Sequence, residues 1–380
     1  MSRVGGAATF DDSIAALLRG EPVRWSAFAM ATGEFLQACC AHGVTGLVHE
    51  RVCAMRGRCD WPPQIGHALA AEMRAQMANE LVCRTELMSV LGALAADGVR
   101  SILLKGAGLA YSVYDNPTSR PRVDTDLLVR RADLERARHV MMTRGYTAPL
   151  HSGGELLFCQ FPLRRIDERG FEHAFDIHWK ISTQPVFADV LTCDEIAALA
   201  TDVPALGPNA RTAAPLHALL LACIHPVMHH RNVEWLLWLY DVHLIASRLS
   251  ERDFDSFADL AVAKRVSAIC AHQLRRARNR FGTDLPDGVM IKFGATGARE
   301  PSAAYLRPRR EWRHELISSM RALPRWRDRV RLFREVTLPR PGYVLKAYGF
   351  APSSFAAALL PVLYLHRLSR GGWKALSGQK

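Results

Sequence analysis

Two carboxylates in one apolar segment constrain this chain more than any other feature. The segment Val123–Val129 reads VDTDLLV, and its apolar residues predict a buried β-strand. Side chains alternate between the two faces of a strand, so we expect Asp124 and Asp126 on one face, about 7 Å apart. Two like charges placed there repel each other and lose hydration. Either that face is a solvated edge, or cations lie between the carboxylates.

A lysine-glycine turn precedes this strand. Residues 102–104 are apolar and stop at Lys105 and Gly106, a pattern that predicts a buried strand turning sharply into a short helix over 107–114. Lysine is rare in this arginine-rich chain, so a lysine here indicates a need for a compact, rotatable ammonium. A basic stretch, Arg120–Arg122, then leads into the acidic strand. Together with a third acid downstream, these neighbours favour the cation-site interpretation over the solvated edge.

A third acid lies on another predicted strand, downstream. Residues 156–163 and 171–179 are predicted to form two strands joined by a polar turn. Alternation places Asp176 and His178 on one face, while Phe175, Ile177 and Trp179 take the other. An Asp and a His on one face suit a pocket wall, or they form a hydrogen-bonded pair on a solvated face.

Three motifs in residues 101–179 resemble those of a known superfamily. LLKG, YxxPxxRPxxDxDLLV and FDIHW are similar to the motifs of the DNA polymerase beta-like nucleotidyltransferase superfamily. Within it they resemble a bacterial branch of nucleotidyltransferases whose substrates are largely undetermined. The superfamily usually carries Gly-Ser at the turn where this chain has Lys-Gly, and the branch also uses Lys-Gly. The resemblance implies an α+β fold, in which a small mixed β-sheet is flanked by N-terminal and C-terminal helical regions.

The resemblance also implies roles for individual residues. It makes Asp124, Asp126 and Asp176 the catalytic acids and the ligands of two Mg²⁺ ions. The nucleotide would be held by four further residues, namely Lys105 and Gly106 at the phosphate turn, Arg120 and His178. The implied reaction transfers NMP from an NTP, such as ATP, to a hydroxyl or phosphate of an acceptor and releases pyrophosphate.

The acceptor is open between a small molecule, a sugar and a peptide, and nucleic acid is less favoured as a partner. A different kind of protein is the alternative, namely a non-catalytic nucleotide- or RNA-binding protein on the same fold. Its support is a net charge of +12 and a basic C-terminal third, which favour an anionic partner or form a solvated surface.

Hydrophobic periodicity, composition and the resemblance together divide the chain into four expected regions. These are an N-terminal helical region (1–98), a nucleotidyltransferase α/β core (99–190), a helical domain covering the cleft (191–290) and a basic C-terminal helical region (291–380). Two sets of apolar residues recur at helical spacing and are predicted to pack inward. They are Leu81, Leu87, Val90, Leu91 and Leu94, and Trp235, Trp238, Leu239 and Val242.

Two histidines in the third region have a spacing that needs comment. His225 and His229 are four residues apart, so one helix would carry both on one face, as in zinc proteases. A zinc site lacks an obvious third ligand here. The resemblance instead implies that His225, His229 and Asp241 line the cleft opposite the carboxylates, and simple packing is the alternative for each.

The remaining features concern the compartment and the last third of the chain. The N-terminus lacks the apolar core of a signal peptide, and no apolar run is long enough to span a bilayer. The nine cysteines form no CxxC pairs, which is typical of reduced thiols, so we expect a cytoplasmic protein without a membrane span. Residues 306–344 predict amphipathic helices with a cationic face, or a surface that binds nucleic acid. Residues 355–374 predict a packed helix, or a peripheral membrane contact.

Overall fold

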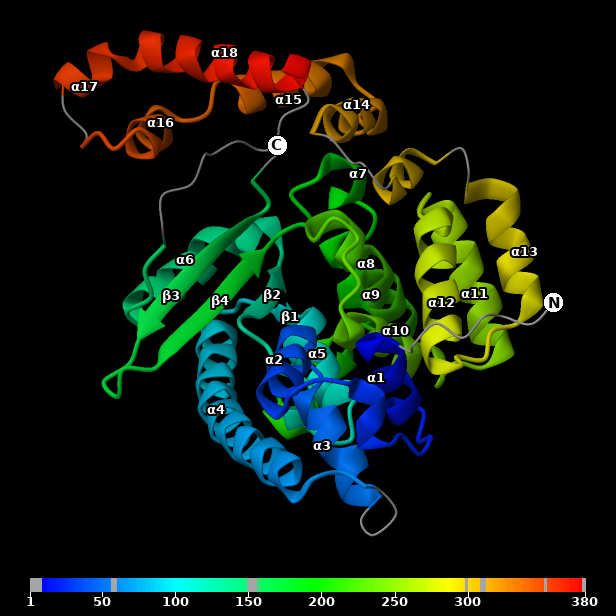
Figure 1. Cartoon of the computed structure of the whole chain (residues 1–380). Coiled ribbons are helices and arrows are strands. Elements are labelled where there is room, and N and C mark those ends of the chain that lie inside the picture. The colour runs from blue at the N-terminus through cyan, green and yellow to red at the C-terminus, as the bar shows by residue number, and fades with distance from the viewer. Residues whose placement is uncertain are drawn as a thin grey trace.

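A six-stranded mixed β-sheet organises the computed structural model (Figure 1), which describes residues 9–55, 60–148, 156, 158–297, 300–307, 312–351 and 354–377. The strand order is β3-β4-β2-β1-β6-β5. Their bounds are β1 (Ser101–Leu103), β2 (Thr125–Val129), β3 (Gln160–Ile166), β4 (Glu172–His178), β5 (Thr201–Asp202) and β6 (Arg211–Thr212). Helical regions precede and follow the strands in the sequence, which confirms the expected α+β fold.

The helices fall into groups along the chain. Before the sheet come α1 (Phe10–Leu18), α2 (Thr32–His42), α3 (Thr45–Ala54) and α4 (Pro63–Ala96). Between and after the strands come α5 (Lys105–Ser112), α6 (Leu134–Thr143), α7 (Pro185–Ala188) and α8 (Cys193–Leu199). The helical half follows with α9 (Pro215–His229), α10 (Leu236–Ala246), α11 (Glu251–Ala263), α12 (Ser267–Phe281) and α13 (Asp287–Thr296). The chain ends with α14 (Trp312–Ala322), α15 (Trp326–Thr337), α16 (Pro341–Ala347), α17 (Ser354–Ala358) and α18 (Leu360–Ser377).

The strands differ from the sequence expectations in three places. Strand β2 begins at Thr125 instead of Val123, and β3 begins at Gln160 instead of residue 156; residue 157 lies outside the described residues. Strands β5 and β6 lie in a stretch expected to be helical, where β6 pairs in parallel with β1. Each of these two strands is two residues long, and hydrophobic periodicity needs a longer run to reveal a strand.

The sheet separates two hydrophobic cores. On β2 the side chains alternate, so Leu127 and Val129 join one core and Leu128 joins the other. The smaller core is closed by α4 and α6, which supply apolar residues from Leu87–Leu94 and Ala137–Met141. The larger core joins the N-terminal helices to α9–α13. The division into four regions stays a prediction.

Two residues expected to pack inward are on the surface instead. Leu81 is 64% exposed on α4, although the later apolar residues of its predicted stripe are buried. Trp235 is 42% exposed because it precedes α10 as its N-cap residue, where the chain is extended. Trp238, Leu239 and Val242 are buried as predicted.

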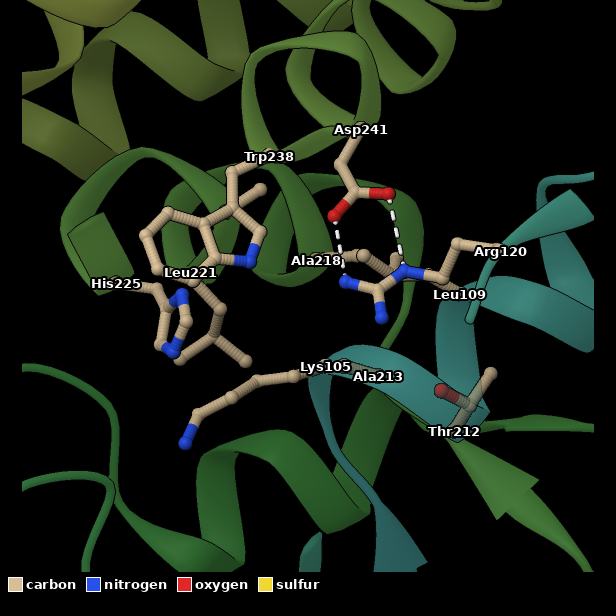
Figure 2. A pocket seen from close by; sticks show the side chains of 11 residues that line it. Lys105, Leu109, Arg120, Thr212, Ala213, Ala218, Leu221, His225, Trp238 and Asp241 are labelled. Atoms are coloured by element: carbon tan, nitrogen blue, oxygen red, sulfur yellow. Dashed lines mark hydrogen bonds and ion pairs between the residues drawn. The ribbon is translucent and has the colours of Figure 1, made fainter. Parts of the chain in front are cut away.

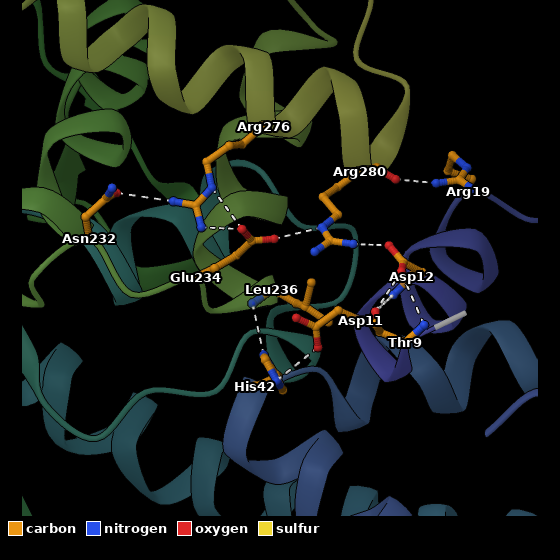
Figure 3. Close-up of polar contacts among 10 residues, drawn as sticks. All are labelled: Thr9, Asp11, Asp12, Arg19, His42, Asn232, Glu234, Leu236, Arg276 and Arg280. Carbon is orange, nitrogen blue, oxygen red and sulfur yellow. Dashed lines mark hydrogen bonds and ion pairs between the residues drawn. The ribbon is translucent and has the colours of Figure 1, made fainter. Parts of the chain in front are cut away.

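Charged contacts tie the first helix to the helical half. Figure 3 shows Glu234 between two arginines of α12, with Arg276 Nε 2.9 Å and Arg280 Nε 2.8 Å from its carboxylate. Arg280 also pairs with Asp12 of α1, and Arg19 donates to the carbonyl of Arg280. These contacts hold α1 against α12, and both helices contribute residues to the larger core.

No helix within the described ranges combines the length and the apolar character needed to cross a membrane.

The lack of a side chain at Gly108 allows α5 to lie very close to the sheet. A Cβ at this position would lie 2.4 Å from Thr212 Oγ1 and 3.1 Å from the carbonyl oxygen of Leu103. We therefore expect Gly108→Ala to lower the free energy of unfolding by about 1–3 kcal/mol, because the helix must move away from β1 and β6. Urea denaturation measures the change.

Gly92→Ala on α4 is the matched control. A Cβ there meets no atom within 4 Å, and alanine favours a helix interior by about 0.5–1 kcal/mol over glycine. An equal loss of stability in both variants would contradict the close approach inferred for Gly108.

Candidate active site

Asp126 and Asp176 lie side by side on neighbouring parallel strands. Strands β2 and β4 pair in parallel with Asp126 opposite Asp176 and Leu127 opposite Ile177. Leu127 and Ile177 belong to the smaller core. Because side chains alternate along each strand, the two carboxylates point to the other face of the sheet. Both residues are buried, so hydrogen bonding and charge must compensate for their lost hydration.

Lys105 and His178 surround the Asp126 carboxylate. His178 Nε2 lies 2.6 Å and Lys105 Nζ lies 3.2 Å from the same oxygen, Oδ1. Burial raises the pKa of Asp126, but the charge of Lys105 and the hydrogen bond from His178 outweigh it and bring the pKa well below its usual value. Asp126 therefore stays ionised at any physiological pH.

The backbone of Lys105 is in an unusual conformation. Its φ of 45° is in the left-handed region, which costs a non-glycine residue about 1–3 kcal/mol. Lys105 is the first residue of α5, and the N-cap residue Leu104 makes no side-chain cap hydrogen bond. The first-turn N–H groups of a helix are suited to an anion. The turn thus presents an ammonium and a helix N-terminus beside the carboxylates.

Asp124 is close to the other two acids but does not lie on the strand. It precedes β2 by one residue, and the neighbouring Val123 is 94% exposed. The prediction that one strand carries both Asp124 and Asp126 is therefore wrong. Burial raises the pKa of Asp124, and the charges of Asp126 and Asp176 raise it further. The role of Asp124 as a metal ligand stays a prediction.

One group of side chains has the arrangement of a metal site. Asp126, Asp176 and His178 each offer a ligand atom within 4.8 Å of the others, and no second such group occurs in the part of the chain that the structure describes. Asp176 Oδ1 is buried without a hydrogen-bond partner, with Arg164 Nη1 3.5 Å away. A buried carboxylate oxygen in this state is available to a cation.

Two residues on β3 complete the surroundings of Asp176, and sequence reasoning missed them. Gln160 Nε2 donates to Asp176 Oδ2 at 2.8 Å, and Arg164 approaches the other oxygen. In the antiparallel pair of β3 and β4, Pro162 is opposite Asp176, so Gln160 and Arg164 flank it on the same face. The hairpin register, once known, would have identified both.

Arg120 and Gly106 lie together in the wall beside Lys105. Arg120 donates to Asp241 through Nε at 3.2 Å and Nη2 at 2.7 Å, and Tyr114 donates to the same carboxylate at 2.7 Å. A Cβ on Gly106 would lie 3.1 Å from Arg120 Nη1, so glycine lets this ion pair approach the turn. Phosphate binding by Arg120 and Gly106 stays a prediction.

A pocket opens between this ion pair and α9. Figure 2 shows the Arg120–Asp241 pair at one end, with His225 and Trp238 opposite it and Lys105 between them. His225 and Asp241 thus line a pocket with Lys105, and His229 lies one turn further along α9. The rings of His225 and Trp238 are perpendicular, with their centroids 5.0 Å apart.

The histidines near this pocket are held neutral. Burial lowers the pKa of His225, and the nearby Lys105 lowers it further. Burial likewise lowers the pKa of His229 to about 3, and Lys105 and His178 add to the shift. The zinc site weighed for this pair has no support, because neither histidine belongs to a group of three metal-ligating side chains among the described residues.

The buried pair of Arg120 and Asp241 should be a major determinant of stability. Their side chains are 7% and 4% exposed. Asp241→Ala leaves the arginine charge buried without its partner, so we expect the free energy of unfolding to fall by about 3–5 kcal/mol. Asp115→Ala removes the exposed partner of Arg248 and should leave urea denaturation nearly unchanged. If the two substitutions lowered the free energy of unfolding by similar amounts, the buried pair would not be the major determinant of stability inferred here.

The neutral histidines predict that acid destabilises the fold. His229 takes up a proton near pH 6.5 in the unfolded chain but only near pH 3 in the folded chain. The unfolded state binds more protons between these values, so stability falls as the pH drops through this window. Each unit of pKa shift corresponds to about 1.4 kcal/mol. Urea denaturation at a series of pH values should show a smaller loss for His229→Gln than for wild type. An equal loss would contradict the prediction.

Comparison with known families agrees with the motifs. A family model described as an uncharacterised nucleotidyltransferase matches residues 29–282, which is well over half of the chain and includes β1–β6. No curated protein matches the chain. The match confirms the resemblance drawn from the Lys-Gly turn, the two acids around β2 and the FDIHW segment. The chain belongs to this family of uncharacterised nucleotidyltransferases.

Proposed function

We propose that this protein is a metal-dependent enzyme that transfers NMP from an NTP to a hydroxyl or phosphate of an acceptor. One observation carries the proposal. Asp126 and Asp176 lie in register on parallel strands, buried and directed to one face, with Lys105 paired to Asp126. Acids on adjacent strands can hold metal ions, and a lysine ammonium at a helix N-terminus can bind phosphate.

The residues at this position fit a divalent cation. Carboxylate oxygens are the ligands that Mg²⁺ prefers, and one oxygen of Asp176 is buried without a hydrogen bond. Asp126 and Asp176 would hold the ion, with Asp124 as a further acid and His178 fixing the orientation of Asp126. When bound, Mg²⁺ polarises phosphate oxygens and neutralises the charge that develops on the leaving pyrophosphate.

Lys105 and the start of α5 would bind the triphosphate. In the structure Lys105 neutralises Asp126, and it also lines the pocket that His225 and the Arg120–Asp241 pair border (Figure 2). A short move of the ammonium would exchange the carboxylate for a phosphate oxygen. The strained backbone at Lys105 would then hold the helix N-terminus toward the same anion.

The transfer itself would be an in-line displacement. The acceptor oxygen forms a bond to the α-phosphorus of the NTP, and the bond from that phosphorus to pyrophosphate breaks. A hydroxyl acceptor gives its proton to the carboxylate of Asp176, and an ionised phosphate attacks without this transfer. Because α9 and α10 border the pocket beside Lys105, we propose that the region 191–290 covers the cleft and provides the acceptor site. The acceptor class is a small molecule, a sugar or a peptide.

Asp126→Asn tests the proposed chemistry. We expect it to reduce transfer by at least about a hundredfold, because an amide supplies neither the charge nor the second ligand oxygen. The measurement incubates purified protein with each α-labelled NTP, Mg²⁺ and cell extract, and follows the transfer of label. Chelation of the metal should abolish transfer by the wild type as well.

The matched control is Asp189→Asn. This carboxylate is the C-cap residue of α7, is 67% exposed and pairs with Lys180, so the variant should transfer label at the wild-type rate. If wild type and Asp126→Asn bind nucleotide alike and neither transfers label, the protein is a nucleotide binder on this fold and the proposed chemistry is wrong.

A further inference from the structure

The C-terminal helices expose an unusual concentration of large apolar side chains. Close to half of the exposed large apolar residues in the described part of the chain lie between residues 326 and 368. In Figure 1 the helices of this segment form an outlying layer, with α18 along its outer edge. Single exposed apolar residues are ordinary on a protein surface, but a concentration of them marks an interaction site.

Helix α15 carries the clearest apolar face. Trp326, Val330 and Phe333 follow one another at steps of four and three residues, so they lie on one side of the helix. They are 68%, 57% and 54% exposed, whereas Leu332, on another side, is 1% exposed and packs inward. Helix α18 adds exposed Val362 and Leu365 at a step of three. Helix α15 therefore packs through the side that carries Leu332 and exposes a second apolar side to solvent.

The charges around this face have one sign. At 100° per residue, Arg329 falls on one flank of the Trp326–Phe333 face, and Arg334 and Arg327 fall on the other. All three arginines are exposed. The acids of α15, Asp328 and Glu335, fall on the opposite side of the helix. The exposed side of α15 is thus an apolar stripe between arginines.

We propose that the exposed apolar stripe of α15, together with the exposed apolar residues of α18, binds the surface of an anionic phospholipid membrane. An interfacial helix buries its apolar stripe at the boundary of the acyl chains and places flanking arginines among the headgroups. Nucleic acid fits less well because Val330, at the centre of the stripe, neither stacks on bases nor binds phosphate. A second copy fits less well because pairing would bring two sets of arginines together.

Vesicle flotation with the full chain tests the apolar part of the surface. We expect wild type to float with vesicles made of equal parts phosphatidylcholine and phosphatidylglycerol, and much less with phosphatidylcholine alone. Trp326→Ser/Val330→Ser should weaken binding by roughly tenfold or more, because it removes the residues that enter the interface. The matched control is Met77→Ser/Leu81→Ser on α4, at the same spacing and 55% and 64% exposed, which should bind like wild type.

A second pair of variants tests the charges. Arg327→Glu/Arg334→Glu should weaken binding to the anionic vesicles by about tenfold or more, since each cation near the surface contributes. Arg252→Glu, at an exposed position on α11, should not. All of these residues are exposed, so urea denaturation should confirm that each variant folds like wild type.

Three results would overturn the proposal. The first is no flotation of wild type with anionic vesicles, and the second is unchanged flotation of both α15 variants. The third is a dimer, or an RNA complex, that the α15 substitutions abolish while vesicle binding is absent. Because nucleotide transfer is measured separately, on Asp126, failure of the membrane surface and failure of the proposed enzyme activity are distinguishable.

Discussion

The pairing of two buried acids on adjacent parallel strands is the constraint on which the rest of the site depends. Asp126 and Asp176 lie in register. Burying two carboxylates side by side would destabilise the fold if nothing compensated for their lost hydration and mutual repulsion. Lys105 and His178 supply that compensation at Asp126, and Gln160 does so at Asp176. The strained turn at the start of α5 is understandable in these terms, because it brings the ammonium to the sheet.

The packing around the sheet keeps this arrangement in place. The alternation of β2 assigns Leu127 to the smaller core and leaves Asp126 on the opposite face, toward α5 and α9. Gly108 allows α5 to lie against β1 and β6. On the far side of the pocket, the buried pair of Arg120 and Asp241 ties the segment before β2 to α10. The helical half therefore supplies part of the wall of the pocket that Lys105 lines.

Local sequence patterns predicted much of the fold and the elements of the site. Strands β1 and β4 and helix α4 follow from apolar runs, alternation and helical periodicity, and the resemblance of the motifs brought Lys105, Asp126 and Asp176 together. The errors have physical causes. Two-residue strands such as β5 and β6 carry no periodic signal, and the outward position of Leu81 depends on where α4 meets its neighbours. Gln160 has no local signature, since its role arises from the hairpin register.

The sequence by itself determined which residue types alternate along each strand, and so which face of β4 carries Asp176 and His178. It also determined the family, through motifs confined to residues 101–179. Only the tertiary structure decided that the ammonium of Lys105 pairs with Asp126, and that Arg120 is buried against Asp241. Periodicity describes one segment at a time, whereas a contact between residues far apart in the chain depends on how segments pack together.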